Sequence, residues 1–281
     1  MKLRLNVKDP HIKAVMQDTT FLDIETSLVD ARVFRSGTQF VGAHQLSSTT
    51  KLLTVAGGTM YDLYTKGADG MWSFGNHQAD TFEENPLDDT FVLARLWDIL
   101  DKARVVVAHN ARFDTGCING RFLELGWPLP SKYSVVCTYQ ALRRYNLTSK
   151  KLDQLSKTLV GAKKIPTDFT LWDRCSNGEV AAFEEMLEYN RGDIRETLFE
   201  VYLRLAPYAP DYAVDFANYR EQKLTCKVDG GKLKILKQMY RDRRNGCSYR
   251  LYRNPRLGIT YRDRYNINSN KAGLGLIKHH I

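Results

Sequence analysis

Three short acidic segments hold the residues of this chain that are best suited to chemistry. In chain order they are Asp23-Ile24-Glu25-Thr26, His109-Asn110-Ala111-Arg112-Phe113-Asp114 and Tyr189-Asn190-Arg191-Gly192-Asp193. Together they supply four carboxylates and one phenol. Converging carboxylates repel one another unless a cation neutralises them, and hard oxygen ligands suit Mg²⁺ or Mn²⁺ better than zinc. The pattern therefore predicts a divalent-metal site, provided that the fold brings the segments together.

The spacing within two of these segments predicts which way their side chains point. Asp23 and Glu25 follow an apolar run typical of a β-strand, in which alternate side chains share a face. Tyr189 and Asp193 are four residues apart in a run with helical character, about residues 179–205, so they share a helix face one turn apart. Two carboxylates are thus directed to one point, and a phenol and a carboxylate to another.

The three segments resemble motifs I, II and III of the DEDD superfamily of 3′–5′ exonucleases, which is DnaQ-like and has an RNase H-like fold. Asp23-x-Glu25 is similar to motif I, and Asn110-x-x-Phe113-Asp114 is similar to motif II. Motif III reads Tyr189-x-x-x-Asp193 without a histidine at the base position, so the chain resembles the DEDDy subgroup, which includes polymerase proofreading domains. Each motif alone is common, and the resemblance, over about residues 18–206, depends on all three in order.

The resemblance implies hydrolysis of phosphodiester bonds with two divalent ions, Mg²⁺ or Mn²⁺, about 3.5–4 Å apart. Asp23 would bridge both ions, and Glu25 and Asp193 would complete the site that generates the nucleophile. Asp114 would hold the second ion partly through water. The Tyr189 hydroxyl would orient the attacking water, because a phenol with a pKa near 10 is a poor general base at neutral pH.

The resemblance also implies substrate-binding positions beside the motifs, namely Thr26, Leu28, Asn110 and Phe113. The Asn110 amide can meet the 3′-terminal nucleotide, and the Phe113 ring can stack on a base. Plain core packing is the alternative for Phe113. Leu28, or its neighbour Val29, could wedge under the terminal base, with an ordinary core position as the alternative.

The basic residues of the chain are concentrated in its last quarter. Residues 211–281 hold 16 Lys and Arg against 6 Asp and Glu, whereas residues 1–210 hold 25 against 26. Arginines alternate with tyrosines there, and phosphate pairing combined with ring stacking can hold a single strand without sequence preference. The alternative is a β-ribbon whose outward face is basic for no such purpose. We expect nucleic-acid contacts from Arg241, Arg244, Arg250, Tyr252 and Arg253.

The apolar periodicity predicts an α/β fold, an RNase H-like mixed sheet flanked by helices, with a small basic β-rich C-terminal module. Strands are expected at 19–25, 32–35, 39–43, 52–57, 60–65, 71–74, 105–108 and 135–138, and helices at 86–104, 111–125, 138–145, 151–160 and 179–205. Pro207 and Pro210 end the last helix. We therefore expect an exonuclease domain at 1–210 and a nucleic-acid-binding module at 211–281.

The C-terminal module is similar to a zinc ribbon that has lost three of its four ligand cysteines. Cys226 is present, whereas Asp229, Asn254 and Leu257 stand where the pattern needs cysteine. We therefore expect a ribbon-like module without bound zinc. The chain has five scattered cysteines and no Cys-x-x-Cys, which argues against a disulfide framework and predicts thiols: Cys117, Cys137, Cys175, Cys226 and Cys247.

The composition is typical of a folded protein, since 281 residues with 43% hydrophobic content can bury a full core. No apolar run approaches the ~20 residues of a membrane span, and residues 1–8 lack the apolar stretch of a secretory signal. We expect a cytoplasmic 3′–5′ exonuclease acting on DNA, preferably single-stranded, with no membrane partner. A 3′–5′ exoribonuclease and a non-catalytic nucleic-acid-binding protein on the same fold are the alternatives. Replication or repair proteins are the candidate partners in trans.

Overall fold

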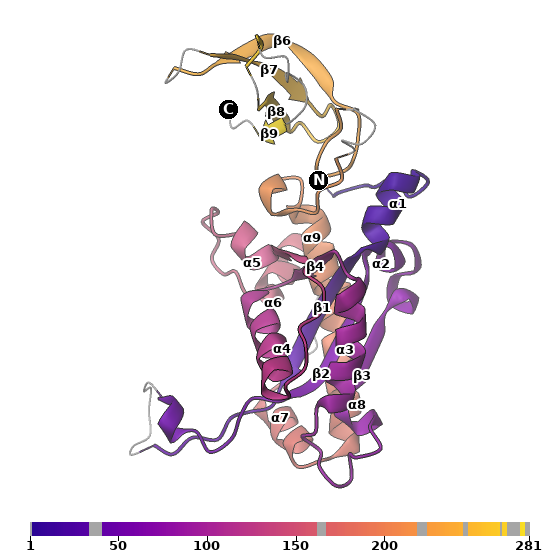
Figure 1. Cartoon of the computed structure of the whole chain (residues 1–281), viewed down its shortest axis with the longest axis vertical. Helices are drawn as coiled ribbons and strands as arrows, with labels where there is room; N and C mark the ends of the chain where they lie inside the picture. Colours follow the sequence, from indigo (N-terminus) through magenta and orange to yellow (C-terminus); the bar gives the residue numbers. More distant parts are fainter. Residues whose placement is uncertain are drawn as a thin grey trace. The chain divides into compact units, whose positions relative to one another are not determined.

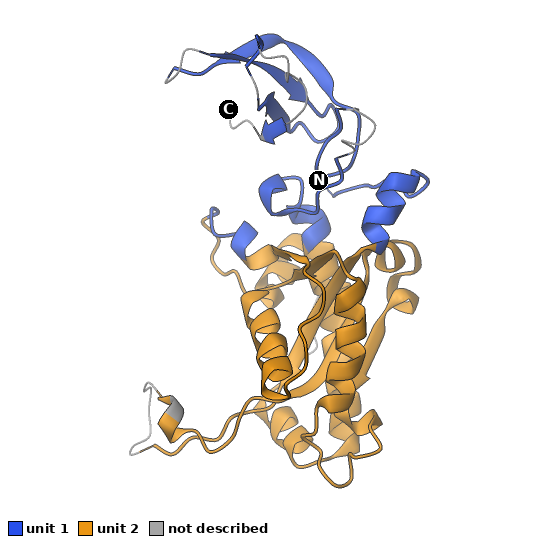
Figure 2. Ribbon diagram, viewed as in Figure 1, with its two compact units in different colours: residues 1–17, 140–145, 202–281 blue, residues 18–139, 146–201 orange. Residues whose placement is uncertain are grey.

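The computed structural model describes residues 2–33, 41–161, 167–217, 224–243, 247–264, 266–268 and 276–278. The chain packs into two compact units, which Figure 2 shows in orange and blue. The larger consists of Asp18–Tyr139 and Asn146–Val201, and the smaller of Met1–Gln17, Gln140–Tyr145 and Tyr202–Ile281. The smaller unit thus begins before the expected boundary at residue 210 and includes the N-terminus. Among the described residues, no helix combines the length and the apolar composition of a membrane-spanning segment.

The larger unit is built on a five-stranded mixed sheet with the strand order β3-β2-β1-β4-β5 (Figure 1). The central strand β1 (Thr19–Thr26) pairs antiparallel with β2 (Leu52–Thr59) and parallel with β4 (Val105–Ala108). The edge strands are β3 (Trp72–Gly75) and β5 (Ser134–Cys137). The expected α/β class is confirmed: a mixed sheet flanked by helices and a separate small β-sheet.

Helices cover both faces of this sheet. On one face, α3 (Thr90–Lys102) and α4 (Arg112–Glu124) share a core with Leu22 and Ile24 of β1. On the other face, α7 (Phe169–Ser176) and α8 (Val180–Gly192) share a core with β2. Because side chains alternate along a strand, Asp23 and Glu25 point away from the α3–α4 core.

The run after α8 stays helical but changes its winding. It continues as a π-helix, η5 (Asp193–Leu198), and then as α9 (Phe199–Leu205). This succession corresponds to the single helix expected at 179–205. A π-helical turn moves the side chains that follow it relative to those before it and is frequent at functional sites.

The expected strand at 60–65 is wrong, because this segment forms the helix α2 (Met60–Lys66). The Thr59 side chain accepts the N–H of Asp62 as an N-cap, and Gly67 ends the helix with a φ of 62°. Met60 and Leu63 are buried one turn apart. The tyrosines and threonine of this segment favour a strand locally, but the cap and the buried pair favour the helix.

The expected strands at 32–35 and 39–43 fall partly outside the described residues, which exclude 34–40. Their described residues form no strand: Ala31 and Leu46 make an isolated β-bridge, and η1 (Ala43–Gln45) is a 3₁₀-helix. The remaining short helical elements of the larger unit are η2 (Gly67–Gly70), η3 (Asn76–Gln78), α6 (Leu152–Leu155) and the π-helix η4 (Ser156–Val160).

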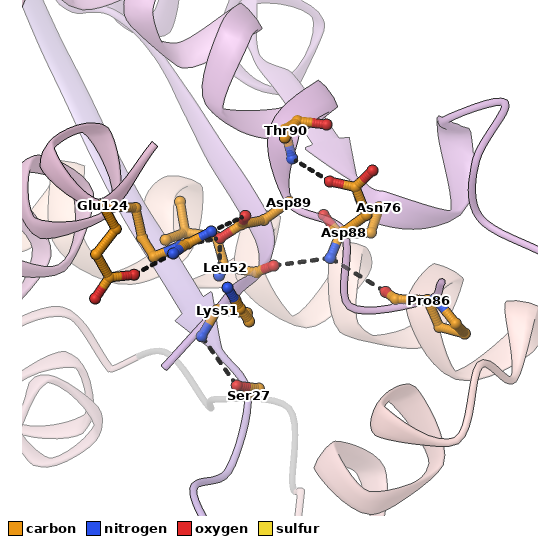
Figure 3. Close-up of polar contacts among 10 residues, drawn as sticks. Ser27, Lys51, Leu52, Asn76, Pro86, Asp88, Asp89, Thr90 and Glu124 are labelled. Carbon is orange, nitrogen blue, oxygen red and sulfur yellow. Dashed lines mark hydrogen bonds and ion pairs between the residues drawn. The ribbon is translucent and has the colours of Figure 1, made fainter. Parts of the chain in front are cut away.

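A buried ion pair holds the start of β2 against α3 and α4 (Figure 3). Arg121 donates from Nε and Nη2 to the two carboxylate oxygens of Asp89, at 2.8 and 2.9 Å, and the Leu52 N–H donates to Oδ2 of Asp89 at 3.0 Å. Asn76 donates from Nδ2 to the Leu52 carbonyl at 2.8 Å. These contacts fix where β2 begins and thereby its register against β1, the strand that carries Asp23 and Glu25.

The smaller unit contains α1 (Pro10–Gln17), α5 (Thr138–Ala141) in part, η6 (Pro210–Tyr212) and a four-stranded antiparallel sheet. The sheet has the strand order β6-β7-β8-β9, with β6 (Lys234–Arg241), β7 (Ser248–Arg253), β8 (Thr260–Asp263) and β9 (Leu276–Lys278). All five cysteines of the chain are thiols, as expected.

Candidate metal centre

Three carboxylates from the first and third acidic segments meet in the larger unit. Asp23, Glu25 and Asp193 each offer an oxygen, and these oxygens lie within 4.8 Å of one another. Asp23 and Glu25 come from one face of β1, and Asp193 is the first residue of η5, which packs against β1. Asp193 is buried and the other two are half-buried. A set of oxygen donors at this spacing suits one or two divalent cations of the Mg²⁺ type.

Asp114 brings a fourth carboxylate to the same strand. Since β4 ends at Ala108 while β1 continues to Thr26, the edge of β1 beyond that point faces the first turn of α4. There the Ile24 N–H, between Asp23 and Glu25, donates to the Asp114 carboxylate. Asp114 does not belong to the group within 4.8 Å, so the second acidic segment lies beside the cluster and not inside it.

The burial of Asp114 changes its protonation. Loss of solvent raises the pKa of its carboxyl to about 7, although the backbone N–H groups of Ile24 and of Asp114 itself act to lower it. Its Oδ2 atom is buried and has no hydrogen-bond partner among the described residues. A neighbouring cation would lower this pKa and satisfy that oxygen, which is the chemistry expected of a metal ligand.

Asn190 is a residue of the site that the sequence pattern did not reveal. It is fully buried, and its Nδ2 donates to Oδ2 of Asp23 at 2.7 Å. Its own Oδ1 is buried without a hydrogen-bond partner among the described residues. Asn190 precedes Asp193 by three residues and therefore lies on the same side of the helix. The signal available in the sequence was a polar residue three positions before the candidate ligand Asp193.

Tyr189 has a fixed ring position one turn before Asp193. The residue is buried in the core formed with Phe183 and Met186, and its ring meets that of Trp172 edge to face at 5.9 Å. Tyr189 is therefore both a core residue and a neighbour of Asp193 along the helix.

The expected substrate-binding residues of the larger unit are accessible. Phe113 is 50% exposed and Leu28 is 37% exposed, which excludes core packing for both. Thr26 is half-buried at the end of β1. Asn110 is exposed and has a φ of 61°, a left-handed conformation that asparagine tolerates better than most residues. This turn places Phe113 on the outside of α4 and Asp114 on the inside.

The expected contact residues of the C-terminal module differ in exposure, and one of them is not described. Arg241, Arg250 and Arg253 are exposed on β6 and β7, and Arg244 lies outside the described residues. The expectation for Tyr252 is wrong, because the residue is only 1% exposed and its hydroxyl donates to Asp263 Oδ2 at 3.3 Å.

The register of the sheet explains the burial of Tyr252. It pairs with Tyr261 on the central strands, so its face is covered there. The aromatic contacts of the opposite face come from Tyr240 and Tyr249, over which the Arg262 guanidinium lies at 5.9 and 4.7 Å from the ring centroids. Side chains at alternate positions of β7 thus belong to two different surfaces.

Two turns of the smaller unit share one hydrogen-bond pattern. In the first, Gly230 N–H donates to the Cys226 carbonyl and Cys226 N–H to the Gly231 carbonyl, both at 2.8 Å. In the second, Gly258 N–H donates to the Asn254 carbonyl and Asn254 N–H to the Ile259 carbonyl, both at 2.9 Å. Gly230 and Gly258 have φ values of 66° and 71°, which favour glycine. Cys226-x-x-Asp229 and Asn254-x-x-Leu257 therefore occupy equivalent turns.

The side chains of these turns form a cluster that does not suit zinc. The buried Asp229 carboxylate accepts from Asn254 Nδ2 at 2.8 Å and from Gly231 N–H at 2.9 Å, and it forms an ion pair with Arg256. Leu257 offers no ligand atom. Burial raises the pKa of the Cys226 thiol, which disfavours the thiolate that zinc requires. We call these residues, Cys226, Asp229, Asn254, Arg256 and Leu257, the Asp229 cluster.

No protein-family model matches the chain, and no curated protein sequence matches it.

Proposed function

We propose that the chain is a metal-dependent 3′–5′ exonuclease that hydrolyses phosphodiester bonds from the 3′ end of DNA, preferably single-stranded. The observation that carries this proposal is the convergence of Asp23, Glu25 and Asp193 within 4.8 Å, with the buried Asp114 carboxyl beside the same strand. A protein that only binds nucleic acid has no use for carboxylates at the place where a phosphate must lie. A two-metal site for phosphodiester cleavage, in contrast, needs carboxylates there to hold the ions.

The donor set supports two Mg²⁺ or Mn²⁺ ions, which when bound would activate water and stabilise the leaving oxygen. Asp23, Glu25 and Asp193 would hold one ion, Asp23 would be shared, and Asp114 would serve the second. Asn190 orients Asp23, because its amide occupies one lone pair of Oδ2 and limits rotation of the carboxylate. Asn190 is thus a positioning residue.

The surrounding residues have roles in holding the substrate. The Tyr189 hydroxyl orients the attacking water, and the packing of its ring against Trp172 reduces the loss of entropy on ordering. Phe113 and Leu28 present exposed apolar surface for contact with the terminal bases, and Asn110 and Thr26 offer polar groups beside them.

The basic sheet of the smaller unit offers a contact of its own with the nucleic acid. Its exposed arginines, Arg241, Arg250 and Arg253, would pair with phosphates. Replication or repair proteins are the candidate partners in trans, and we propose a cytoplasmic location. RNA is the alternative substrate, because the proposed metal chemistry acts on the phosphodiester bond, which DNA and RNA share. A non-catalytic nucleic-acid-binding protein is the alternative without chemistry.

Digestion of end-labelled oligomers tests the proposal. DNA and RNA strands labelled at the 5′ or the 3′ end are incubated with Mg²⁺, with Mn²⁺ or with EDTA. We expect 5′-labelled DNA to shorten stepwise, 3′-labelled DNA to release a labelled mononucleotide at once, and EDTA to stop both. Faster digestion of RNA would change the substrate class. Absence of metal-dependent products from all strands would leave the non-catalytic alternative.

A further inference from the structure

The smaller unit holds a cavity between its N-terminal segment and the turns of the Asp229 cluster. The cavity has a volume of about 970 Å³ and is lined from the described ranges 6–12, 224–235 and 254–256. Ile12 of α1 packs on one of these turns, since a Cβ at Gly230 would lie 2.9 Å from Ile12 Cδ1. Pockets for small molecules measure roughly 300–1,000 Å³. The cavity is therefore at the upper limit for a compact ligand and has room for an extended one.

The apolar part of the lining is aliphatic. It consists of six side chains: Pro10, Ile12, Leu224, Leu233, Ile235 and Pro255. Ile235 is 64% exposed, so its side chain is open to a partner. Phe, Tyr and Trp are absent from the described residues of the lining, whereas nucleobases are usually held by stacking on such rings. The lining thus favours aliphatic side chains of a protein over the bases of a nucleic acid.

The acidic side chains of the lining already have partners within the chain. Asp9 Oδ1 caps α1 by accepting two backbone N–H groups of its first turn, at 2.9 and 3.3 Å. The Asp229 carboxylate is buried and forms its ion pair with Arg256. Both negative charges are thereby compensated before any ligand arrives.

The cations of the lining keep capacity for a ligand. Lys232 is exposed and has no ion pair among the described residues. Arg256 is 49% exposed and uses only Nη2 for its contacts with Asp229 and the Arg4 carbonyl, which leaves Nε and Nη1 for another acceptor. Residues 1–17, which supply one wall, hold 4 Lys and Arg against 1 Asp. The cavity and its surroundings therefore complement a negatively charged ligand.

Ile235 also belongs to an end strand of the sheet. β6 is the first strand in the order β6-β7-β8-β9 (Figure 1), and it exposes Lys234, Lys237 and Arg241 but contains no acidic residue. An end strand presents backbone N–H and C=O groups to which an extended peptide can add. Cations along the same strand can pair with carboxylates of that peptide. The occupant that suits this arrangement is thus both extended and acidic.

We propose that the cavity and β6 dock an extended, acidic segment of a partner protein. One aliphatic side chain of the segment occupies the cavity beside Ile235, and its carboxylates pair with Lys232 and Arg256. Burial of the aliphatic group supplies affinity, and the cations supply selectivity for acidic sequences. This docking site goes beyond the proposed function and does not require the metal centre.

The test uses the full-length protein and two matched double variants. Lys232→Glu/Ile235→Ser changes one cation and one aliphatic side chain of the cavity. Lys102→Glu/Ile277→Ser makes the same changes at exposed positions of α3 and β9 that do not line the cavity. Thermal melting verifies that both variants are folded. Random displayed peptides are selected on the wild type in EDTA, and the strongest binder is synthesised with a fluorescent label for anisotropy measurements.

We expect the selected peptides to combine Asp or Glu with Leu, Ile or Val. The labelled peptide should bind Lys232→Glu/Ile235→Ser at least tenfold more weakly than it binds the wild type and the control variant. Equal binding to the two double variants, or selected peptides without acidic residues, would overturn the docking site.

A labelled single strand of DNA is measured on the same proteins. Equal affinity of this strand for the two double variants is expected. A loss of at least tenfold for Lys232→Glu/Ile235→Ser alone would overturn the proposal, because the cavity would then belong to a nucleic-acid surface. All of these measurements record binding in EDTA, so their outcome is independent of whether the protein hydrolyses DNA.

Discussion

The candidate metal centre of the larger unit and the Asp229 cluster of the smaller unit both bury carboxylates, but they compensate the charge differently. Asp229 is neutralised from within the chain by Arg256 and receives further donors from Asn254 and Gly231. The metal centre instead gathers three carboxylates within 4.8 Å and adds a fourth, Asp114, with a raised pKa. The ion pair of Asp229 serves structure, whereas the three gathered carboxylates are the oxygen donors for which we propose a divalent cation.

The largest effect is expected from Asp193→Asn. Removal of one anionic ligand should lower the rate of hydrolysis by roughly 10³-fold or more, because the metal contributes several kcal/mol to the transition state. The protein should remain folded, since the change relieves repulsion between carboxylates. Single-turnover digestion of a labelled strand in Mg²⁺ measures the rate. Asp98→Asn, an exposed carboxylate of α3, is the control, and a rate for Asp193→Asn equal to that of the control would remove Asp193 from the site.

Tyr189→Phe separates the packing role of the ring from the chemical role of the hydroxyl. The ring contact with Trp172 is retained, so stability should change little, while the rate should fall by about 10- to 10³-fold if the hydroxyl positions water. The rate constant at saturating substrate is the quantity to compare. Tyr208→Phe, an exposed tyrosine, provides the control. An unchanged rate would show that the Tyr189 hydroxyl has no role in hydrolysis and that the residue serves only the core.

Arg256→Ala tests the other half of the comparison. Asp229 would lose its cation but keep two hydrogen bonds, so we expect a loss of about 1–3 kcal/mol in the free energy of unfolding. Arg253→Ala, an exposed arginine of β7, should change it by less than about 0.5 kcal/mol. Denaturant unfolding in the presence of EDTA measures both. Zinc bound stoichiometrically to the purified protein would contradict the internal compensation of Asp229.

The raised pKa of Asp114 predicts a pH dependence of the metal-free protein. The folded protein holds this proton up to about pH 7, whereas the unfolded chain releases it near the ordinary value of 3.8. The contribution of Asp114 to the free energy of unfolding is therefore fully present below the unfolded pKa. It is lost as the pH rises towards 7. Asp114→Asn cannot titrate, so in EDTA its stability relative to wild type should increase from pH 5 to pH 8.

Unfolding curves at several pH values, with Asp98→Asn as the control, measure this difference. Addition of Mg²⁺ at pH 8 should reduce the difference in stability between wild type and Asp114→Asn, because a bound cation stabilises the wild-type carboxylate. A difference between wild type and Asp114→Asn that does not vary with pH would show that Asp114 is ionised in the metal-free protein.

The smallest effect is expected from the basic sheet. Arg241→Gln/Arg250→Gln should weaken binding of single strands and reduce the slope of log K against log salt by about 0.7 for each arginine–phosphate pair removed. The substitution Tyr252→Phe should leave this slope unchanged, because Tyr252 is buried. Fluorescence anisotropy with a labelled strand in EDTA measures binding without hydrolysis. An unaltered slope for the arginine variant would indicate that the sheet serves another partner.

Local periodicity was sufficient for the elements that carry the acidic segments. The strand at 19–25, the strand at 105–108 and the helix that follows it were predicted within one or two residues. Alternation in a strand and the four-residue spacing in a helix are properties of the backbone, so the common face of Asp23 and Glu25 and the proximity of Tyr189 to Asp193 along the helix could be read from the chain alone.

Contacts between distant segments decided the rest. Asn190 meets Asp23 across 167 positions of sequence, and no local pattern encodes such a pair. The sequence predicts Tyr252 as a nucleic-acid contact, whereas the register with Tyr261 places it on the covered face of its sheet. The helix at Met60–Lys66 likewise depends on burial of Met60 and Leu63 against the larger unit.

By itself, the sequence determined which residues could bind a cation and in which direction each pair would point, because both follow from side-chain chemistry and backbone period. The tertiary structure decided which of them meet: three carboxylates within 4.8 Å, with Asp114 beside them at the edge of β1 where β4 has ended. It also decided that Asp229 is neutralised by Arg256, since only packing brings two separate turns together and buries the Asp229 carboxylate beside the guanidinium.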